Sequence, residues 1–266
     1  ENAVAIQDCG PVNNRVGLVF IGDGFTAEEL TTKWQPHVQS VTTRMINEEE
    51  PYARYRKFIN VYRVDIESNE SGADDVIAGA YVDTALGGNR ESQNTCWLDW
   101  RLAHSKIDEA LGDAPQQWKV LALNFATCTG RANIKYGAIY PVQSLINYEV
   151  MLHESGHAFF DLADEYYNEG VTHTGEEIDR PNISNVTENP KWSQWLGYSQ
   201  PHLGGEISTY EGAYYSEFGL WRPSKISLMK NGYHPFDAVA METAILEIYK
   251  HVNPIDAHSE NTQTLT

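Results

Sequence analysis

A segment with two histidines and a glutamate, His153-Glu154-Ser155-Gly156-His157, constrains this 266-residue chain more than any other feature. Apolar residues flank it at 150–152 and 158–160, so residues 148–162 are predicted to form a largely buried helix. Ionisable side chains in a buried helix need partners, because leaving them unpaired away from water is costly. A bound metal ion satisfies them together. The chain is therefore expected to build a metal site around this helix.

The spacing of these residues matches the chemistry of a catalytic zinc ion. Side chains four residues apart share one face of a helix, so His153 and His157 can bind one zinc ion. Glu154 lies beside the ion, where it can take a proton from zinc-bound water and later deliver it to a leaving amine. The segment therefore predicts a zinc-dependent hydrolase with Glu154 as general base and acid, in preference to a surface helix with two histidines.

A catalytic zinc ion also needs a third protein ligand and an open position for water. No later residue of a straight helix reaches back to the ion, so the chain must turn after His157. The acids that follow are Asp161, Asp164 and Glu165. Asp161 lies one turn beyond His157, about 6 Å along the axis, which favours a capping or supporting role. We therefore predict Asp164 as the third ligand, with Glu165 or a residue further along the chain as the alternatives.

Composition excludes several classes of partner. The formal net charge is -18, from 19 basic and 37 acidic residues. This balance argues against binding to nucleic acid or to an anionic membrane surface, both of which need basic patches. No run of about 18 apolar residues is present, so no segment is predicted to span a membrane. The hydrophobic fraction of 41% is ordinary for a globular protein. We expect a monomer whose partners are its substrates.

The cysteines bear on the cellular compartment. Cys9, Cys96 and Cys128 allow at most one internal disulfide. A bridge between Cys96 and Cys128 is one possibility and free thiols are the other; a bridge would favour an extracellular setting. The first four residues lack the basic start and apolar stretch of a signal peptide. Either the protein is cytosolic or a targeting segment is missing from this sequence; we expect the second, in a secreted, cell-surface or periplasmic protein.

Patterns along the chain predict an N-terminal half rich in strands and helices and a less regular C-terminal half. Strands are predicted at 15–21, 58–66, 118–126 and 136–142, the last suited to a sheet edge because it contains Pro141. Thr26 and Glu29 form a capping-box pattern, so a helix is predicted from there towards Asn47, with a break or kink at Pro36. Further helices are predicted at 100–111 and 236–251. Residues 168–236 lack periodicity and are expected to pack irregularly around a site.

The sequence HESGHAFFDLADEY at 153–166 resembles the IgA-peptidase-type zinc metallopeptidases, or igalysins, of the metzincin group. The segment at 22–26 and the stretches 58–66 and 118–148 are similar to family positions as well. Metzincins carry a methionine turn beneath the metal, and residues 227–232 resemble one. By this resemblance Met229 forms an apolar floor under the histidines without binding zinc.

The sequence departs from the common metzincin pattern HExxHxxGxxH/D in two places. Phe160 stands where the pattern has a turn glycine, and Ala163 stands where it has the third ligand. An insertion of one residue in the turn would restore Asp164 to the metal. Tyr233 and His234, just after the methionine turn, are candidates for a contact with the metal or the transition state, with packing or solvent exposure as the alternative.

The resemblance implies an α+β, metzincin-like zincin fold and one catalytic domain over residues 1–266. Its N-terminal subdomain, about 1–165, would hold a twisted mixed β-sheet and the zinc-binding helix. Its C-terminal subdomain, about 166–266, would be irregular and end in a helix. A substrate peptide would lie in the cleft between them and pair with a sheet-edge strand near 136–142.

The implied activity is that of a zinc endopeptidase acting on protein or peptide substrates. The alternatives are a catalytically inactive, peptidase-like binding module and a zinc hydrolase of a non-peptide substrate. Residues 212–221, with Tyr214 and Tyr215, are candidates for the wall of the specificity pocket. A second metal, calcium, is a weaker expectation at the acidic loop 65–75, for which a solvated loop is the other interpretation.

Overall fold

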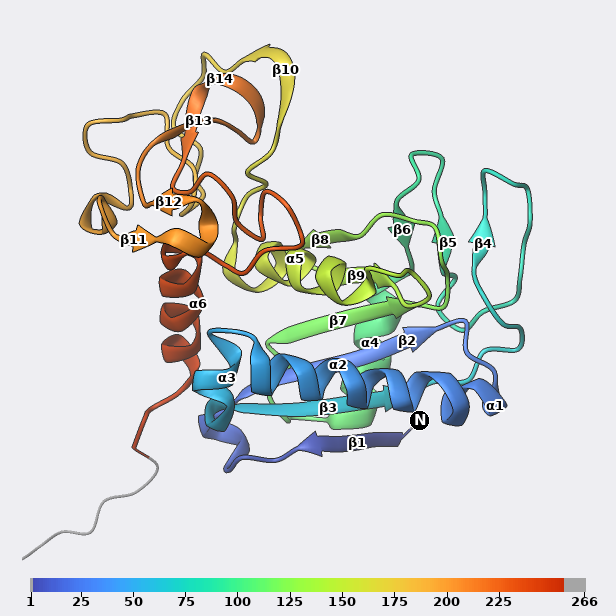
Figure 1. The fold of residues 1–266 in the computed structure, drawn as a ribbon. Coiled ribbons are helices and arrows are strands. Elements are labelled where there is room, and N and C mark those ends of the chain that lie inside the picture. Colours follow the sequence, from blue (N-terminus) through green and yellow to red (C-terminus); the bar gives the residue numbers. More distant parts are fainter. Residues whose placement is uncertain (1, 256–266) are drawn as a thin grey trace, which may run out of the picture.

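The computed structural model describes residues 2–255, and its centre is a six-stranded mixed sheet (Figure 1). The strand order is β1-β3-β2-β7-β9-β8. Strands β3, β2, β7 and β9 run parallel to one another, whereas β1 and β8 pair antiparallel at the two edges. The strands are β1 (Asn2–Gln7), β2 (Val16–Asp23), β3 (Ile59–Asp65), β7 (Trp118–Leu123), β8 (Arg131–Asn133) and β9 (Gly137–Pro141).

Alternating side chains of the sheet serve two separate apolar cores. On β2, Leu18 and Phe20 pack into one core, and Val19 and Ile21 pack into the other. Because both faces are covered, the central strands are apolar throughout, as is typical of buried parallel strands. The four strands predicted from the sequence are present as β2, β3, β7 and β9.

The prediction that strand 136–142 forms the sheet edge is wrong. Strand β9 lies between β7 and β8, so β8 is the edge strand at this side of the sheet. Pro141 is tolerated because β8 pairs only with 137–139 of β9, so the missing N–H of proline costs no bond to β8. The sequence gives little signal for β8, because its three residues, Arg-Ala-Asn, are short and polar.

Helices cover the two faces of the sheet. Figure 1 shows α2 (Gln35–Glu48) in front of the sheet and α4 (Trp100–Leu111) behind it. The short helices are α1 (Ala27–Glu29) and α3 (Tyr52–Tyr55), with 3-10 turns η1 (Val12–Asn14) and η3 (Arg56–Phe58). The capping box of Thr26 and Glu29 is confirmed. A π-helical turn, η2 (Leu30–Trp34), joins α1 to α2, so Pro36 lies at the start of α2 rather than in a break.

Helix α5 (Asn147–Phe160) carries the histidine segment and shares the core of α2. The last helix, α6 (Ala238–His251), packs against it through Ala240, Ala244 and Ile248, which lie in the same core. Both helices were predicted, α5 within a residue or two of its observed ends. No helix within residues 2–255 is long and apolar enough to cross a membrane.

The segment between α5 and α6 contains more strand than its sequence suggests. Strands β10 (Tyr167–Thr172), β13 (Tyr210–Ala213) and β14 (Tyr215–Arg222) form one small sheet. Strands β11 (Ser199–Gln200) and β12 (Gly205–Glu206) form another, between turns η4 (Ser193–Trp195) and η5 (Pro201–Leu203). Glycines with positive φ, at 212 and 219, and register shifts interrupt β13 and β14. These interruptions remove the period-two pattern, so the strands were missed.

A long loop with three short strands follows β3. These are β4 (Asp74–Asp75), β5 (Asn89–Arg90) and β6 (Cys96–Trp97). A disulfide joins Cys96 to Cys128, so of the two possibilities left open by the sequence, a bridge or free thiols, the bridge is present. Two carboxylates of the loop 65–75, for which calcium was considered, form ion pairs within the protein. Asp65 pairs with Arg63 and Asp75 with Arg90, each at 2.6 Å, so these contacts give the calcium expectation no support.

Candidate metal centre and active site

Three side chains converge at the end of α5. His153 and His157 come from the helix, and Asp164 comes from the segment that follows it. The Nε2 atoms of the two rings lie 3.2 Å apart. Asp164 Oδ1 lies 3.0 Å from Nε2 of His153 and 3.2 Å from Nε2 of His157. Within the part of the chain that the structure describes, no other group of three or more histidine, cysteine or acidic side chains gathers in this way.

The turn after the helix explains how Asp164 reaches the histidines. The helix ends at Asp161, which takes the left-handed conformation with φ of 55°. Aspartate tolerates this conformation better than a bulky residue such as Phe160 does. The turn therefore falls one residue later than the common pattern places it, and the acid moves from position 163 to 164. Asp161 itself caps the helix and pairs with Arg180 at 2.7 Å, as its spacing suggested.

Glu165, the other acid considered for the third position, has a structural role. It is fully buried and accepts hydrogen bonds from Asn182 at 2.9 Å and from Ser227 at 2.5 Å. Burial, with the nearby charge of Asp237, raises the pKa of Glu165 to about 8. Its backbone N–H donates to the carbonyl of Met229 at 2.9 Å. Through these hydrogen bonds Glu165 connects the turn after α5 to the segment around Met229.

The ring tautomers decide what the three converging atoms can bind. Nδ1 of His153 lies 3.0 Å from the carbonyl oxygen of Leu228, and Nδ1 of His157 lies 2.6 Å from that of Leu162. A carbonyl oxygen only accepts, so each Nδ1 carries the proton and each neutral ring presents a lone pair at Nε2. Two lone pairs and a carboxylate oxygen therefore face one another. This arrangement is unfavourable unless a cation or a shared proton lies among them.

The spacing of the three donor atoms fits a zinc ion. Ligands at 2.0–2.1 Å from a tetrahedral ion lie about 3.3 Å from one another. The observed separations of 3.0, 3.2 and 3.2 Å are close to this value. Two imidazoles and one carboxylate are also a usual protein ligand set for catalytic zinc. The backbone carbonyls at both Nδ1 atoms provide the support that ligand histidines require.

Charges at the site influence one another. Without a cation, a proton bound at Nε2 of either ring is donated to Asp164. Burial favours the neutral form of Asp164, but these hydrogen bonds outweigh it and hold the pKa of Asp164 well below its usual range. Burial likewise opposes the charging of His157, but its hydrogen bond to Asp164 outweighs this and raises its pKa. Asp164 is therefore ionised at neutral pH, as a metal ligand must be.

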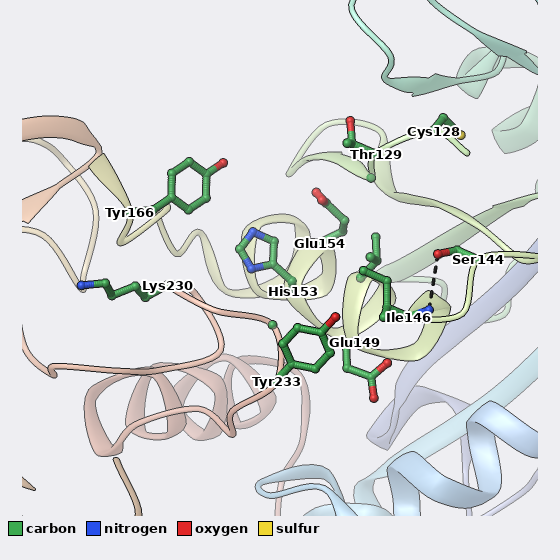
Figure 2. Close-up of a pocket in the computed structure, with 13 residues that line it drawn as sticks. Cys128, Thr129, Ser144, Ile146, Glu149, His153, Glu154, Tyr166, Lys230 and Tyr233 are labelled. Atoms are coloured by element: carbon green, nitrogen blue, oxygen red, sulfur yellow. Dashed lines mark hydrogen bonds between the residues drawn. The ribbon is translucent and has the colours of Figure 1, made fainter. Parts of the chain in front are cut away.

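Glu154 lies on the same helix, in a different environment. Its side chain is almost completely buried, and it lines a pocket together with His153 (Figure 2). Burial, with a smaller contribution from the charge of Asp164, raises the pKa of Glu154 to about 7, although the nearby His153 opposes this. A carboxyl group with this pKa can both take and give a proton near neutral pH.

The pocket beside Glu154 has a volume of about 300 Å³ and mainly apolar walls. Figure 2 shows Tyr166 and Tyr233 on two sides of it and the loop at Cys128 and Thr129 on a third. The other lining residues are Gly130, Ser144, Ile146, Glu149, Val150, Lys230 and Gly232. His234 lines a different cavity, so of the two candidates that follow residues 227–232 only Tyr233 lies at this pocket.

Gly130 lets the pocket wall approach Glu154. A Cβ atom at this position would lie 2.4 Å from Oε1 of Glu154, which is too close for a real contact. The disulfide of Cys128 and the backbone bond from the Cys96 N–H to the Thr129 carbonyl hold this loop in place. Sequence reasoning missed Gly130, because the contact joins a loop to a helix far along the chain.

The segment around Met229 lies against α5. Met229 is fully buried, and a Cβ atom at Gly156 would lie 2.6 Å from its sulfur atom. The neighbouring carbonyl of Leu228 is the one that accepts from His153. Tyr215, considered as a pocket wall, instead donates a hydrogen bond from its hydroxyl to Oδ2 of Asp164. No feature of the sequence pointed to this contact.

Comparison with known proteins adds one finding. A family model described as IgA Peptidase M64 matches residues 4–203. The matched stretch contains His153, Glu154, His157 and Asp164. A search of curated proteins found no match.

Proposed function

Because the chain belongs to the IgA peptidase M64 family, we propose that it is a zinc-dependent endopeptidase that hydrolyses protein or peptide substrates. The observation that carries the proposal is the convergence of three donor atoms. His153 Nε2, His157 Nε2 and Asp164 Oδ1 lie 3.0–3.2 Å apart, with both imidazole lone pairs turned inward. These three residues would hold the ion.

A zinc ion bound there supplies a Lewis acid next to the substrate carbonyl and lowers the pKa of water. The residues of the chain contribute the proton transfers and the orientation. Glu154 faces the pocket with a pKa of about 7. It takes a proton from the attacking water and passes that proton to the leaving amine. Gly130 keeps space for the carboxylate in both steps.

Tyr166 is the side chain that we assign to the substrate carbonyl oxygen. It lines the same pocket as His153 and Glu154. Burial, with the charge of Asp164, raises the pKa of Tyr166 to about 12, so its hydroxyl stays protonated at neutral pH. A neutral hydroxyl that donates to the developing oxyanion stabilises the transition state.

The edge of the main sheet provides a template for the substrate backbone. Strand β8 (Arg131–Asn133) pairs with β9 on one side only, and Gly130 directly precedes it. An extended peptide paired with the free side of β8 would run past the pocket. This assigns to β8 the substrate-pairing role that the sequence suggested for 136–142.

Two further features support the broader assignment. Met229, buried against Gly156 of the histidine-bearing helix, supports a methionine turn and membership of the metzincin group. The disulfide between Cys96 and Cys128 supports a protein that works outside the reducing cytosol, whether secreted, at the cell surface or in the periplasm. The single catalytic domain over 1–266, its division near residue 165 and the monomeric state stay predictions.

Substitution of Glu154 tests the mechanism against the inactive-module alternative. We expect Glu154→Gln to lower casein hydrolysis by about 100-fold or more, while the zinc content stays near that of wild type because Glu154 is not a ligand. Wild-type protein that binds zinc but cleaves no peptide would favour the binding module. Full activity of the variant would overturn the role of Glu154.

A further inference from the structure

Tyr215 contacts the acid of the metal centre from the side away from the histidines. Its hydroxyl donates to Oδ2 of Asp164, whereas Oδ1 of the same carboxylate faces both imidazoles. We propose that Tyr215 is a positioning residue, which holds Asp164 in the orientation that binds the metal. The inference rests on the proposed zinc site.

The direction of this hydrogen bond follows from the groups involved. An ionised carboxylate only accepts, so the single proton of the Tyr215 hydroxyl goes to Asp164. The hydroxyl of Tyr166 lies 3.5 Å from that of Tyr215, which is a long contact. Tyr215 is therefore committed to Asp164, and in its long contact with Tyr166 it can only accept.

The three proposed ligands differ in how they are supported. Each histidine is fixed by a backbone carbonyl at Nδ1 and by its place on α5. Asp164 lies beyond the end of the helix, where no helical backbone holds it. Its second oxygen needs a donor to decide which oxygen turns towards the metal, and Tyr215 supplies it. Loss of such outer contacts typically weakens metal affinity by about 10–100-fold.

The backbone at Tyr215 is a second, independent observation. Tyr214 and Tyr215 have φ values of 46° and 63°, a left-handed conformation that bulky residues rarely adopt. The N–H of Tyr214 donates to the carbonyl of Asp164, and that of Tyr215 to the carbonyl of Tyr166, each at 3.0 Å. The unusual turn is thus tied to the backbone of the acid itself. Strained conformations of this kind persist where the surrounding structure requires them, often at functional sites.

Zinc affinity measured by competition with a chromophoric chelator tests the proposal without any assay of activity. We expect Tyr215→Phe to raise the zinc dissociation constant by about 10–100-fold. Tyr214→Phe is the matched control, because it removes a hydroxyl from the same turn. Within the described residues, the hydroxyl of Tyr214 makes no hydrogen bond. Its zinc affinity should equal that of wild type.

Two further measurements separate positioning from a general loss of structure. The visible spectrum of the cobalt-substituted protein should change in Tyr215→Phe and not in Tyr214→Phe, because it reports the ligand arrangement. In a double-mutant cycle, Tyr215→Phe should have no further effect on zinc affinity once Asp164 is replaced in Asp164→Ala. This cycle remains decisive if Tyr215→Phe also lowers the melting temperature.

The outcomes distinguish this inference from the proposed function. If wild-type protein binds one zinc ion and Tyr215→Phe binds it equally tightly, Tyr215 does not position Asp164 and only this inference is overturned. An equal loss of affinity from Tyr215→Phe in the Asp164→Ala background would also overturn it. If wild-type protein binds no zinc at the site, both the inference and the proposed function fail.

Discussion

Nε2 of His153 and Nε2 of His157 lie 3.2 Å apart, while the other nitrogen of each ring donates to a backbone carbonyl. The two lone pairs therefore face each other, and the nearest third group is the negatively charged carboxylate of Asp164. Packing alone does not explain why these groups converge, because they repel one another without a cation or proton. The proposal of a metal centre rests on this relationship.

Removal of metal should destabilise the folded protein. A ligand that binds only the native state, at a free concentration about 1,000 times its dissociation constant, stabilises that state by about 4 kcal/mol. Chelation with 1,10-phenanthroline is therefore expected to lower the melting temperature by roughly 10 °C. Added zinc should restore it and added calcium should not. Identical melting curves with and without zinc would contradict the account.

Tyr166→Phe should slow catalysis without disturbing the metal. Loss of one donor to the oxyanion typically lowers kcat by about 100-fold or more. KM and zinc content should stay close to wild type, because the aromatic ring remains and Tyr166 is not a ligand. Tyr167→Phe, at the next residue and equally exposed, is the control and should keep its kcat. A Tyr166→Phe enzyme with unchanged kcat would exclude the assigned role.

Gly130→Ala should displace the carboxylate of Glu154. The added methyl group would meet Oε1 and Cγ of Glu154 at 2.4 and 2.6 Å, so the side chain must move. A displacement of about 1 Å at a catalytic group can cost about 100-fold in rate. We expect a fall in kcat of this order with zinc content unchanged. Retention of wild-type kcat would show that Glu154 has more freedom than the structure indicates.

A buried histidine outside the site should make stability depend on pH. His37 lies on α2, with Nε2 2.7 Å from the hydroxyl of Tyr140 on β9, and burial lowers the pKa of His37 to about 4. The unfolded chain binds a proton here below about pH 6.5, whereas the folded chain does so only near pH 4. This group should therefore reduce stability as pH falls from 6.5 to 4, by up to about 3 kcal/mol in total.

Chemical denaturation of His37→Gln across this range checks that expectation. The variant cannot titrate at this position, so its stability should fall less steeply between pH 6.5 and 4 than that of wild type. Equal slopes for wild type and His37→Gln would show that His37 gains its proton as readily in the folded state as in the unfolded chain.

Sequence reasoning recovered the parts of the site that local patterns encode. Helical spacing alone brings His153 and His157 to one face, and the need for a turn after His157 predicts that Asp164 lies near them. The buried central strands were equally plain, because a strand covered on both faces is apolar throughout. The structure adds the reason why the proposed ligand is Asp164 and not residue 163, namely that the left-handed turn residue is Asp161.

The remaining features depend on contacts between distant segments. Gly130 matters only because its loop approaches Glu154, which lies on a helix 24 residues later in the sequence. Tyr215 reaches Asp164 through a turn with two left-handed tyrosines, where a local pattern would favour glycine or asparagine. The edge strand β8 is too short and polar to be recognised before its pairing with β9 is known.

The most direct test is a crystal structure of zinc-loaded protein with anomalous diffraction measured at the zinc absorption edge. The account predicts one peak among His153 Nε2, His157 Nε2 and Asp164 Oδ1, with Glu154 beside it and outside the ligand set. Absence of a peak at this position, or a zinc ion bound there without Asp164, would contradict it.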